Sequence, residues 1–222
     1  MKVRKNRFGK VWVNVASGVY GLEDYINLEN HMFLTLSSLY PALKYLIPSK
    51  YHHILNSYRE SKSTFKMVKY NCRKPLRFSS GSVDHIVSSH FLEHIYRDDV
   101  TVVLKGFFKV LKPDATLHII IPDLNAIVME YIHAKDIGNK FAADELLIET
   151  ILSRKNQGSL MYRLIEFTGN HGIQHYWMYD KESMTKIILQ AGFCLVEADK
   201  VPSNLYKVGD HHSIHIYAKK PT

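Results

Sequence analysis

The sequence predicts an α/β protein with a doubly wound, mostly parallel sheet of seven strands and helical insertions. Two stretches of the chain have the order strand, helix, strand with short links, which is the pattern of a parallel-sheet unit. Further short β-rich segments precede these units. No repeat or long Gly/Ser linker interrupts the 222 residues, so we expect one domain over 1–222.

The first unit is centred on residues 98–111. Apolar side chains recur there at steps of three and four residues, which predicts a helix with one buried face. Lys112, Pro113 and Asp114 then predict a helix stop and a turn. The β-rich runs before and after this helix predict two neighbouring parallel strands, at 83–89 and 116–121.

In the second unit, Asp180 is placed to cap a helix that ends at Gly192. The remaining strands are expected at 11–15, 25–28, 65–70, 194–198 and 213–218. Two segments, at about 30–64 and 124–170, exceed what a minimal sheet needs. We expect both to be helical insertions that cover the sheet rather than separate domains.

Composition excludes several classes of protein. Hydrophobic residues make up 46% and charged residues 23% of the chain, which is typical of a globular protein. Two cysteines are too few for a disulfide framework or a four-cysteine zinc site. The sequence has neither a spanning apolar run nor a signal peptide, so we expect a cytoplasmic protein. The net charge of +8 favours anionic partners without choosing among them.

Ligands of open α/β sheets bind at the carboxyl ends of the strands. The loop 14–21 follows the first strand, and Gly18 would let backbone N–H groups approach a ligand there. An ordinary strand-ending turn is the alternative interpretation of this loop. Glu29 follows the second strand, where a carboxylate can accept hydrogen bonds from a ribose diol. The other strand ends contribute Asn71, Cys72, Ser89, His90 and Asp123.

A set of motifs appears in a fixed order along the chain. Residues 82–95 include Ser-Ser-His followed by Leu-Glu-His, and Leu-Lys-Pro and Ile-Pro-Asp follow at 111–113 and 121–123. With Ile26 to Glu29 and His175 to Tyr179, the chain resembles the class I S-adenosylmethionine-dependent methyltransferases. It is most similar to their small type-11-like branch, which is often associated with surface-glycan modification. The resemblance implies a Rossmann-like fold and O-methylation of a sugar hydroxyl on a glycan.

The resemblance also implies where S-adenosylmethionine binds. The loop after the first strand would hold the methionine part, Glu29 the ribose, and the ends of the third and fourth strands the adenine and the sulfonium side. The implied cofactor-binding residues are Asn14, Ala16, Ser17, Gly18, Glu29, Asn71, Cys72, Ser89 and His90.

The chain departs from the family pattern at three places. Ala16 replaces the first loop glycine, Asn14 stands where an acidic residue is usual, and Asp114 and Ala115 replace a glycine pair. Only seven residues separate Gly18 from Ile26, too few for a helical crossover. Either the first helix is reduced to a turn, or the second strand begins elsewhere.

Methyl transfer needs a base only to remove the proton of the acceptor. We expect His90 in that role, with Asp123 and His175 as further catalytic or acceptor-binding groups. A residue that only orders the loop is the alternative for His90, and an ion pair or a buried hydrogen bond is the alternative for Glu93 and His94. No tight ligand spacing predicts a metal site.

Three alternatives remain open from the sequence. A degenerate methyltransferase fold could serve as a binding module, since the loop glycines are altered. The acceptor could instead be RNA or a small molecule, although no nucleic-acid-binding motif favours RNA. The sequence does not define the oligomeric state.

Overall fold

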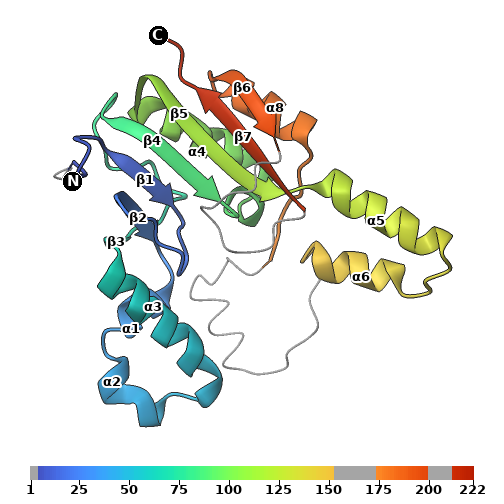
Figure 1. Cartoon of the computed structure of the whole chain (residues 1–222), viewed down its shortest axis with the longest axis horizontal. Helices are drawn as coiled ribbons and strands as arrows, with labels where there is room; N and C mark the ends of the chain where they lie inside the picture. The colour runs from blue at the N-terminus through green and yellow to red at the C-terminus, as the bar shows by residue number, and fades with distance from the viewer. Residues whose placement is uncertain (1–4, 153–173, 200–211) are drawn as a thin grey trace.

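The computed structural model describes residues 5–152, 174–199 and 212–222. One sheet lies at its centre, with the strand order β3-β2-β1-β4-β5-β7-β6 (Figure 1). The first five strands pair in parallel, whereas β7 is antiparallel to both β5 and β6. The strand order reverses between β1 and β4, which is where sheets of this kind bind ligands. The predicted mostly parallel α/β sheet is therefore confirmed.

The strands lie close to the segments that the sequence predicts. They are Trp12–Val15 (β1), Tyr25–Glu29 (β2), Met67–Lys69 (β3), Val83–Ser89 (β4), Leu111–Pro122 (β5), Cys194–Asp199 (β6) and Ser213–Lys219 (β7). The predicted turn at 112–114 is wrong, because these residues belong to β5. The register with β4 shifts at this point, and Asp114 has a φ of 60°, so the strand bends without ending.

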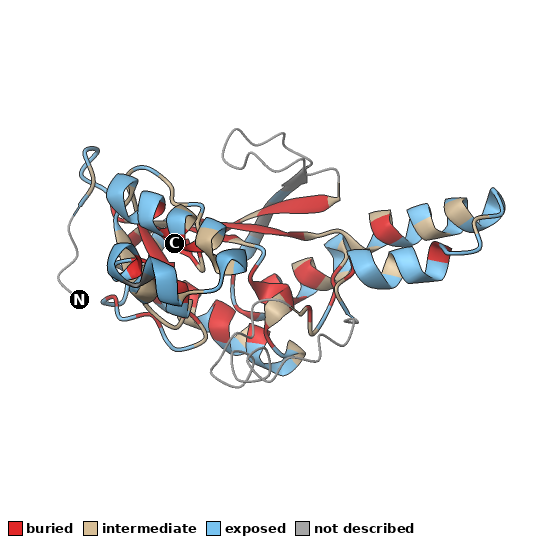
Figure 2. Ribbon diagram, turned by 90° about the horizontal axis from the view of Figure 1, so that it is seen from below, coloured by how far each residue is buried: buried red, intermediate tan, exposed pale blue. Residues whose placement is uncertain are grey.

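Helices α4 (Arg97–Val110) and α8 (Lys181–Gln190) pack against the sheet and form the main core with it. The buried side of α4 carries the periodic apolar residues, among them Val100, Val103, Leu104 and Phe107. Asp180 caps α8 as predicted, and its carboxylate accepts from the backbone N–H of Ser183 at 2.8 Å. In Figure 2 the buried residues are concentrated in these layers.

The segment between β2 and β3 is helical. It contains α1 (Met32–Leu36), α2 (Tyr40–Leu43), α3 (His52–Thr64) and the 3-10 turns η1 (Lys44–Leu46) and η2 (Ser49–Tyr51). Its buried side chains form a second apolar cluster: Phe33, Leu34, Tyr40, Leu55 and Tyr58. Whether this segment and the later one are insertions in a single domain stays a prediction.

The connection from β1 to β2 contains no helix, so the first crossover is indeed reduced to turns. The Asn27 side chain stabilises this short connection. Its Oδ1 accepts from the backbone N–H of Leu22 at 2.8 Å and from Nδ2 of Asn14 at 2.9 Å. Its Nδ2 donates to the carbonyl of Leu22 at 3.1 Å. A polar pair buried within the β1–β2 ladder thus replaces the packing that a helix would provide.

Helices α5 (Leu124–Asp136) and α6 (Ala142–Glu149) form a hairpin that projects from the sheet (Figures 1 and 2). Part of the predicted insertion at 124–170 lies outside the described residues. His212, just before β7, contacts Glu130 of α5 and Glu149 of α6 at 2.6 and 2.7 Å. Within the described ranges, none of the helices has the length and apolarity needed to cross a membrane.

Candidate functional site

The carboxyl ends of β1 and β2 meet at the switch point, and Glu29 joins them. Its Oε2 accepts from the backbone N–H of Gly18 at 2.6 Å. Its Oε1 accepts from the backbone N–H groups of Asn30 and His31 at 2.7 and 2.6 Å. Gly18 and Glu29 therefore lie in direct contact, as a shared binding rim requires. We call the carboxyl ends of β1, β2, β3 and β4 the rim.

The loop after β1 has unusual backbone geometry. Ala16 and Gly18 have φ values of 53° and 56°, a region that glycine adopts without strain and alanine does not. The N–H of Ser17 donates to the carbonyl of Leu28 at 3.0 Å, which holds the loop against β2. The Ser17 hydroxyl is buried and has no hydrogen-bond partner within the described residues. An unpartnered buried hydroxyl at a loop of this kind suits a polar ligand.

Asn14 lies in β1, directly before this loop. It is 1% exposed, and its Nδ2 donates to the side chain of Asn27 and to the carbonyl of Tyr20. Its Oδ1 is buried without a hydrogen-bond partner in the described part of the chain. The contacts of Asn14 therefore support the loop from beneath.

Asn71 and Cys72 follow β3, next to the same rim. The Asn71 side chain accepts from the backbone N–H of Arg73 at 3.1 Å, which stabilises a turn. Burial raises the pKa of the Cys72 thiol to about 12, so the thiol is protonated and unreactive at neutral pH.

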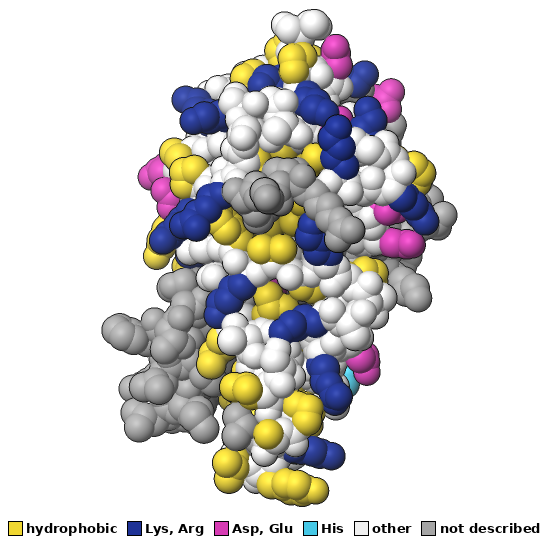
Figure 3. Space-filling model, turned by 90° about the vertical axis from the view of Figure 1, so that its left-hand side faces the viewer, with side chains coloured by type: hydrophobic (Ala, Val, Ile, Leu, Met, Phe, Trp, Pro, Cys, Tyr) yellow, Lys and Arg dark blue, Asp and Glu magenta, His cyan; other side chains and the backbone are white. Residues whose placement is uncertain are grey.

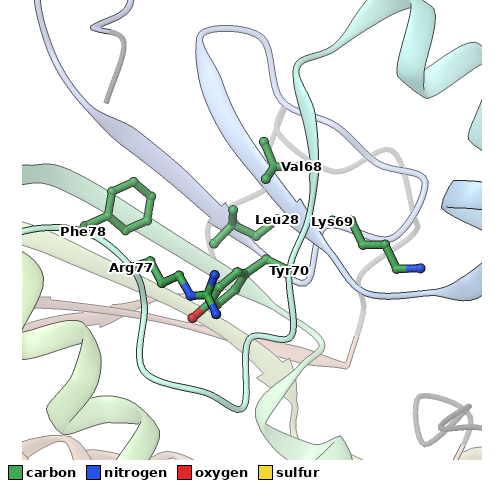
Figure 4. Close-up of a pocket in the computed structure, with 6 residues that line it drawn as sticks. All are labelled: Leu28, Val68, Lys69, Tyr70, Arg77 and Phe78. Carbon is green, nitrogen blue, oxygen red and sulfur yellow. The ribbon is translucent and has the colours of Figure 1, made fainter. Parts of the chain in front are cut away.

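An apolar pocket of about 300 Å³ opens beside the end of β3. Leu28, Val68 and Phe78 line its apolar side. Tyr70 and Arg77 lie together at its edge, with the guanidinium 5.9 Å from the ring centre (Figure 4). Lys69 is the remaining lining residue and extends away from the others in Figure 4.

Ser89 ends β4, and His90 follows it with a φ of 47°. The His90 side chain is 46% exposed at the rim. Its Nδ1 lies 3.3 Å from Oε1 of Glu93, and its Nε2 lies 3.3 Å from the hydroxyl of Ser213. The carboxylate favours the tautomer that carries its proton on Nδ1, which leaves Nε2 as the basic nitrogen.

Glu93 lies in η3 (Leu92–His94) and is completely buried. Three histidines surround it: His90, His94 and His175. Burial is the main cause that lowers the pKa of His175, and the charge of Glu93 offsets it only in part. His175 is therefore a neutral imidazole at neutral pH. An ion pair or a buried hydrogen bond is the alternative role that the sequence offers for Glu93, but nothing in the sequence predicts its closeness to His175, which is distant along the chain.

Asp123 caps α5, accepting from the backbone N–H of Asn125 at 2.9 Å. Its backbone also bridges to Tyr179, which follows the His175 segment. The carboxylate is half-buried and serves the helix terminus in this structure.

The face that carries β1 to β3 and α1 to α3 is rich in basic side chains. Figure 3 shows Lys and Arg spread across it, with few Asp and Glu between them. This distribution agrees with the net charge of +8 and would attract an anionic ligand to this face.

Residues 49–119, about a third of the chain, match the family model of a methyltransferase domain. The match covers α3, β3, β4, α4 and part of β5. Among curated proteins no sequence matches the chain.

Solved structures of S-adenosylmethionine-dependent methyltransferases are similar over nearly the whole chain. One from Methanosarcina mazei has a TM-score of 0.52 and 14% identity, covering 95% of this chain and 92% of its own. One from Thermotoga maritima has a TM-score of 0.51 and 16% identity, covering 95% and 81%. One from Archaeoglobus fulgidus has a TM-score of 0.51 and 13% identity, covering 95% and 86%.

At these identities the structural likeness establishes the fold alone, and the activity rests on the domain match. The domain match supports an enzyme of the methyltransferase class.

Proposed function

We propose that this chain transfers a methyl group from S-adenosylmethionine to a sugar hydroxyl of a glycan. The observation that carries the proposal is the contact of Gly18 with Glu29 at the ends of adjacent strands, 2.6 Å from backbone nitrogen to carboxylate oxygen. Sheets of this kind bind the ribose of a nucleoside ligand with a carboxylate beside a ligand-approachable backbone at the topological switch point.

The residues at the rim fit this cofactor. Glu29 has about four lone-pair sites and uses three on backbone donors, so one remains for a ribose hydroxyl. A second ribose contact would displace or share the bond from Gly18. The unpartnered Ser17 hydroxyl is available to the amino-acid part. Asn71 and Cys72 would border the adenine. When bound, the cofactor supplies a methyl group on a positively charged sulfur.

His90 is the proposed base. It is exposed at the end of β4, and the Glu93 carboxylate beside Nδ1 would stabilise the imidazolium that forms on proton uptake. The acceptor hydroxyl would donate its proton to Nε2. The Ser213 hydroxyl lies 3.3 Å from Nε2, so the acceptor hydroxyl would displace or share this contact.

Aromatic side chains beside the Glu93 segment support a carbohydrate acceptor. Tyr96 and Trp177 are 60% and 48% exposed, and the rings of Tyr96 and Tyr176 lie 4.7 Å apart. Backbone hydrogen bonds from Tyr176 and Trp177 to the carbonyl of Glu93 fix this group near the rim. Exposed aromatic faces with polar edges suit the apolar faces and hydroxyl rims of sugar rings.

Calorimetry with S-adenosylmethionine tests the donor half of the proposal. Wild-type protein should bind one equivalent, and Glu29→Ala should bind much more weakly. Absence of binding by well-folded wild type would refute this half.

Glycans from a strain that lacks the gene test the acceptor half. They should accept labelled methyl groups from the purified protein, and the labelled product should be an O-methyl sugar. Transfer only to small metabolites or to RNA would exclude the glycan acceptor while leaving the donor half intact.

A further inference from the structure

A second group of residues lies behind the rim. Glu93, His94 and His175 each present one ligand-type atom, a carboxylate oxygen or an imidazole nitrogen, and these atoms all lie within 4.8 Å of one another. Ligand atoms around a tetrahedral zinc ion are about 3.4 Å apart, given bond lengths of about 2.0–2.2 Å. Small rotations of the three side chains would bring their ligand atoms from within 4.8 Å to the separation of about 3.4 Å that zinc requires.

The burial of Glu93 is unusual for a carboxylate. Its exposed fraction is 0%, and neither carboxylate oxygen has a hydrogen-bond partner within the described residues. Nδ1 of His90 lies 3.3 Å from its Oε1. A buried carboxylate is costly unless it is paired or coordinates a metal ion. Since the group has two oxygens, one can serve His90 and the other can bind an ion.

The surrounding contacts orient the two histidines as metal ligands are usually oriented. Nδ1 of His94 lies 3.0 Å from the carbonyl oxygen of Gln174 and must therefore be the protonated nitrogen. Nδ1 of His175 faces the sulfur of Met178 at 3.2 Å. Nε2 of His94 then carries the lone pair, and the Gln174 carbonyl holds that ring in place. The ring of His175 is held by Met178 and by a backbone hydrogen bond with Thr150. His94 is half-buried, whereas Glu93 and His175 are buried.

We propose that Glu93, His94 and His175 form a binding site for a divalent transition-metal ion. Two imidazoles and one carboxylate are the protein ligands of open zinc sites, in which a fourth position is left for water or substrate. The site adjoins His90 through the shared carboxylate, so an ion there would lie next to the rim. The proposal does not depend on methyl transfer, because it rests on the ligand set alone.

The other group of ligand-type residues, Glu130, Glu149 and His212, serves as a contrast. Both ring nitrogens of His212 contact carboxylates, at 2.6 and 2.7 Å. Burial lowers the pKa of His212, but its hydrogen bonds to Glu149 and Glu130 outweigh this effect and raise it. A metal ion at His212 would have to displace one of these two carboxylate contacts. His212→Ala is therefore the matched control.

Zinc binding by the full-length chain tests the proposal, with a chromophoric chelator as competitor. Wild type and His212→Ala should each bind one equivalent of Zn²⁺ with equal affinity. His94→Ala should weaken binding by more than about 100-fold, the upper range for loss of an outer contact of a metal ligand. Co²⁺ in place of Zn²⁺ should give visible d–d bands that His94→Ala abolishes.

A variant that fails to fold would be detected by its circular dichroism. His94 is the least buried of the three ligands, so its replacement should disturb the fold least. His94→Gln is a second variant, in which the side-chain volume is largely kept. Equal zinc affinity of wild type, His94→Ala and His94→Gln would overturn the proposal, as would loss of binding in His212→Ala. Failure of methyl transfer alongside intact zinc binding would refute only the proposed function.

Discussion

Replacing Glu29 by glutamine isolates the role of its charge, because the two side chains have nearly the same shape. The carboxylate accepts three backbone hydrogen bonds, at 2.6, 2.7 and 2.6 Å. The glutamine amide nitrogen cannot accept, so at least one of these N–H groups loses its partner, at a cost of about 1–3 kcal/mol. The remaining bonds lose their charge assistance, which roughly halves their strength.

We therefore expect Glu29→Gln to lower the free energy of unfolding by about 2–4 kcal/mol. Urea unfolding followed by circular dichroism measures the change. Glu23→Gln is the matched control: Glu23 is 77% exposed and contacts Arg7 at 3.5 Å, so its replacement should change stability by less than about 0.5 kcal/mol. If both variants lose the same small amount, Glu29 does not organise the rim.

Three further predictions concern the loop, the sheet and the base. A Cβ on Gly21 would lie 2.4 Å from the Phe65 ring, so Gly21→Ala should destabilise the protein by about 1–3 kcal/mol. Gly106→Ala in α4 has open space around its Cβ and should instead stabilise the protein by about 0.5–1 kcal/mol. Thermal unfolding of both variants measures these changes. Burial, with a smaller effect from neighbouring histidines, lowers the pKa of His118 to about 3. Below pH 6.5 the unfolded chain therefore binds more protons than the folded protein does. The free energy of unfolding should fall by about 2 kcal/mol between pH 8 and pH 5 because of this residue. If His118→Gln showed the same dependence of stability on pH as wild type, this assignment would be wrong. His90→Gln should reduce turnover by about 10²–10⁴-fold in a labelled-methyl assay while largely preserving affinity for S-adenosylhomocysteine, whereas equal losses of both would give His90 a purely structural role.

Local rules predicted the elements that depend on nearby residues. The periodic apolar side chains fix α4, and Asp180 with Gly192 brackets α8, because helix periodicity and capping involve contacts within a few residues. The same rules failed at 112–114. Pro113 and Asp114 resemble a turn in isolation, but they form an irregularity within β5: Leu111 pairs with Val83 and Thr116 with His85, and the strand continues between these pairs. Tertiary pairing there overrides local preference.

The site was predictable where the fold brings strand ends together. Gly18 and Glu29 end adjacent parallel strands, so topology alone places them side by side. The contact of His94 with His175 was not predictable, because it depends on how a long connection returns to η3. Asn27 was likewise missed: a buried asparagine in a strand gives no signal until the short β1–β2 connection requires its hydrogen bonds.

The most direct measurement of the central claim is a crystal structure of the protein with S-adenosylhomocysteine. We predict that the ribose hydroxyls contact Glu29, that the amino-acid part lies against the loop of Gly18, and that the sulfur faces the end of β4 near His90. A ligand bound elsewhere, with Glu29 beyond hydrogen-bond distance of the ribose, would contradict the claim.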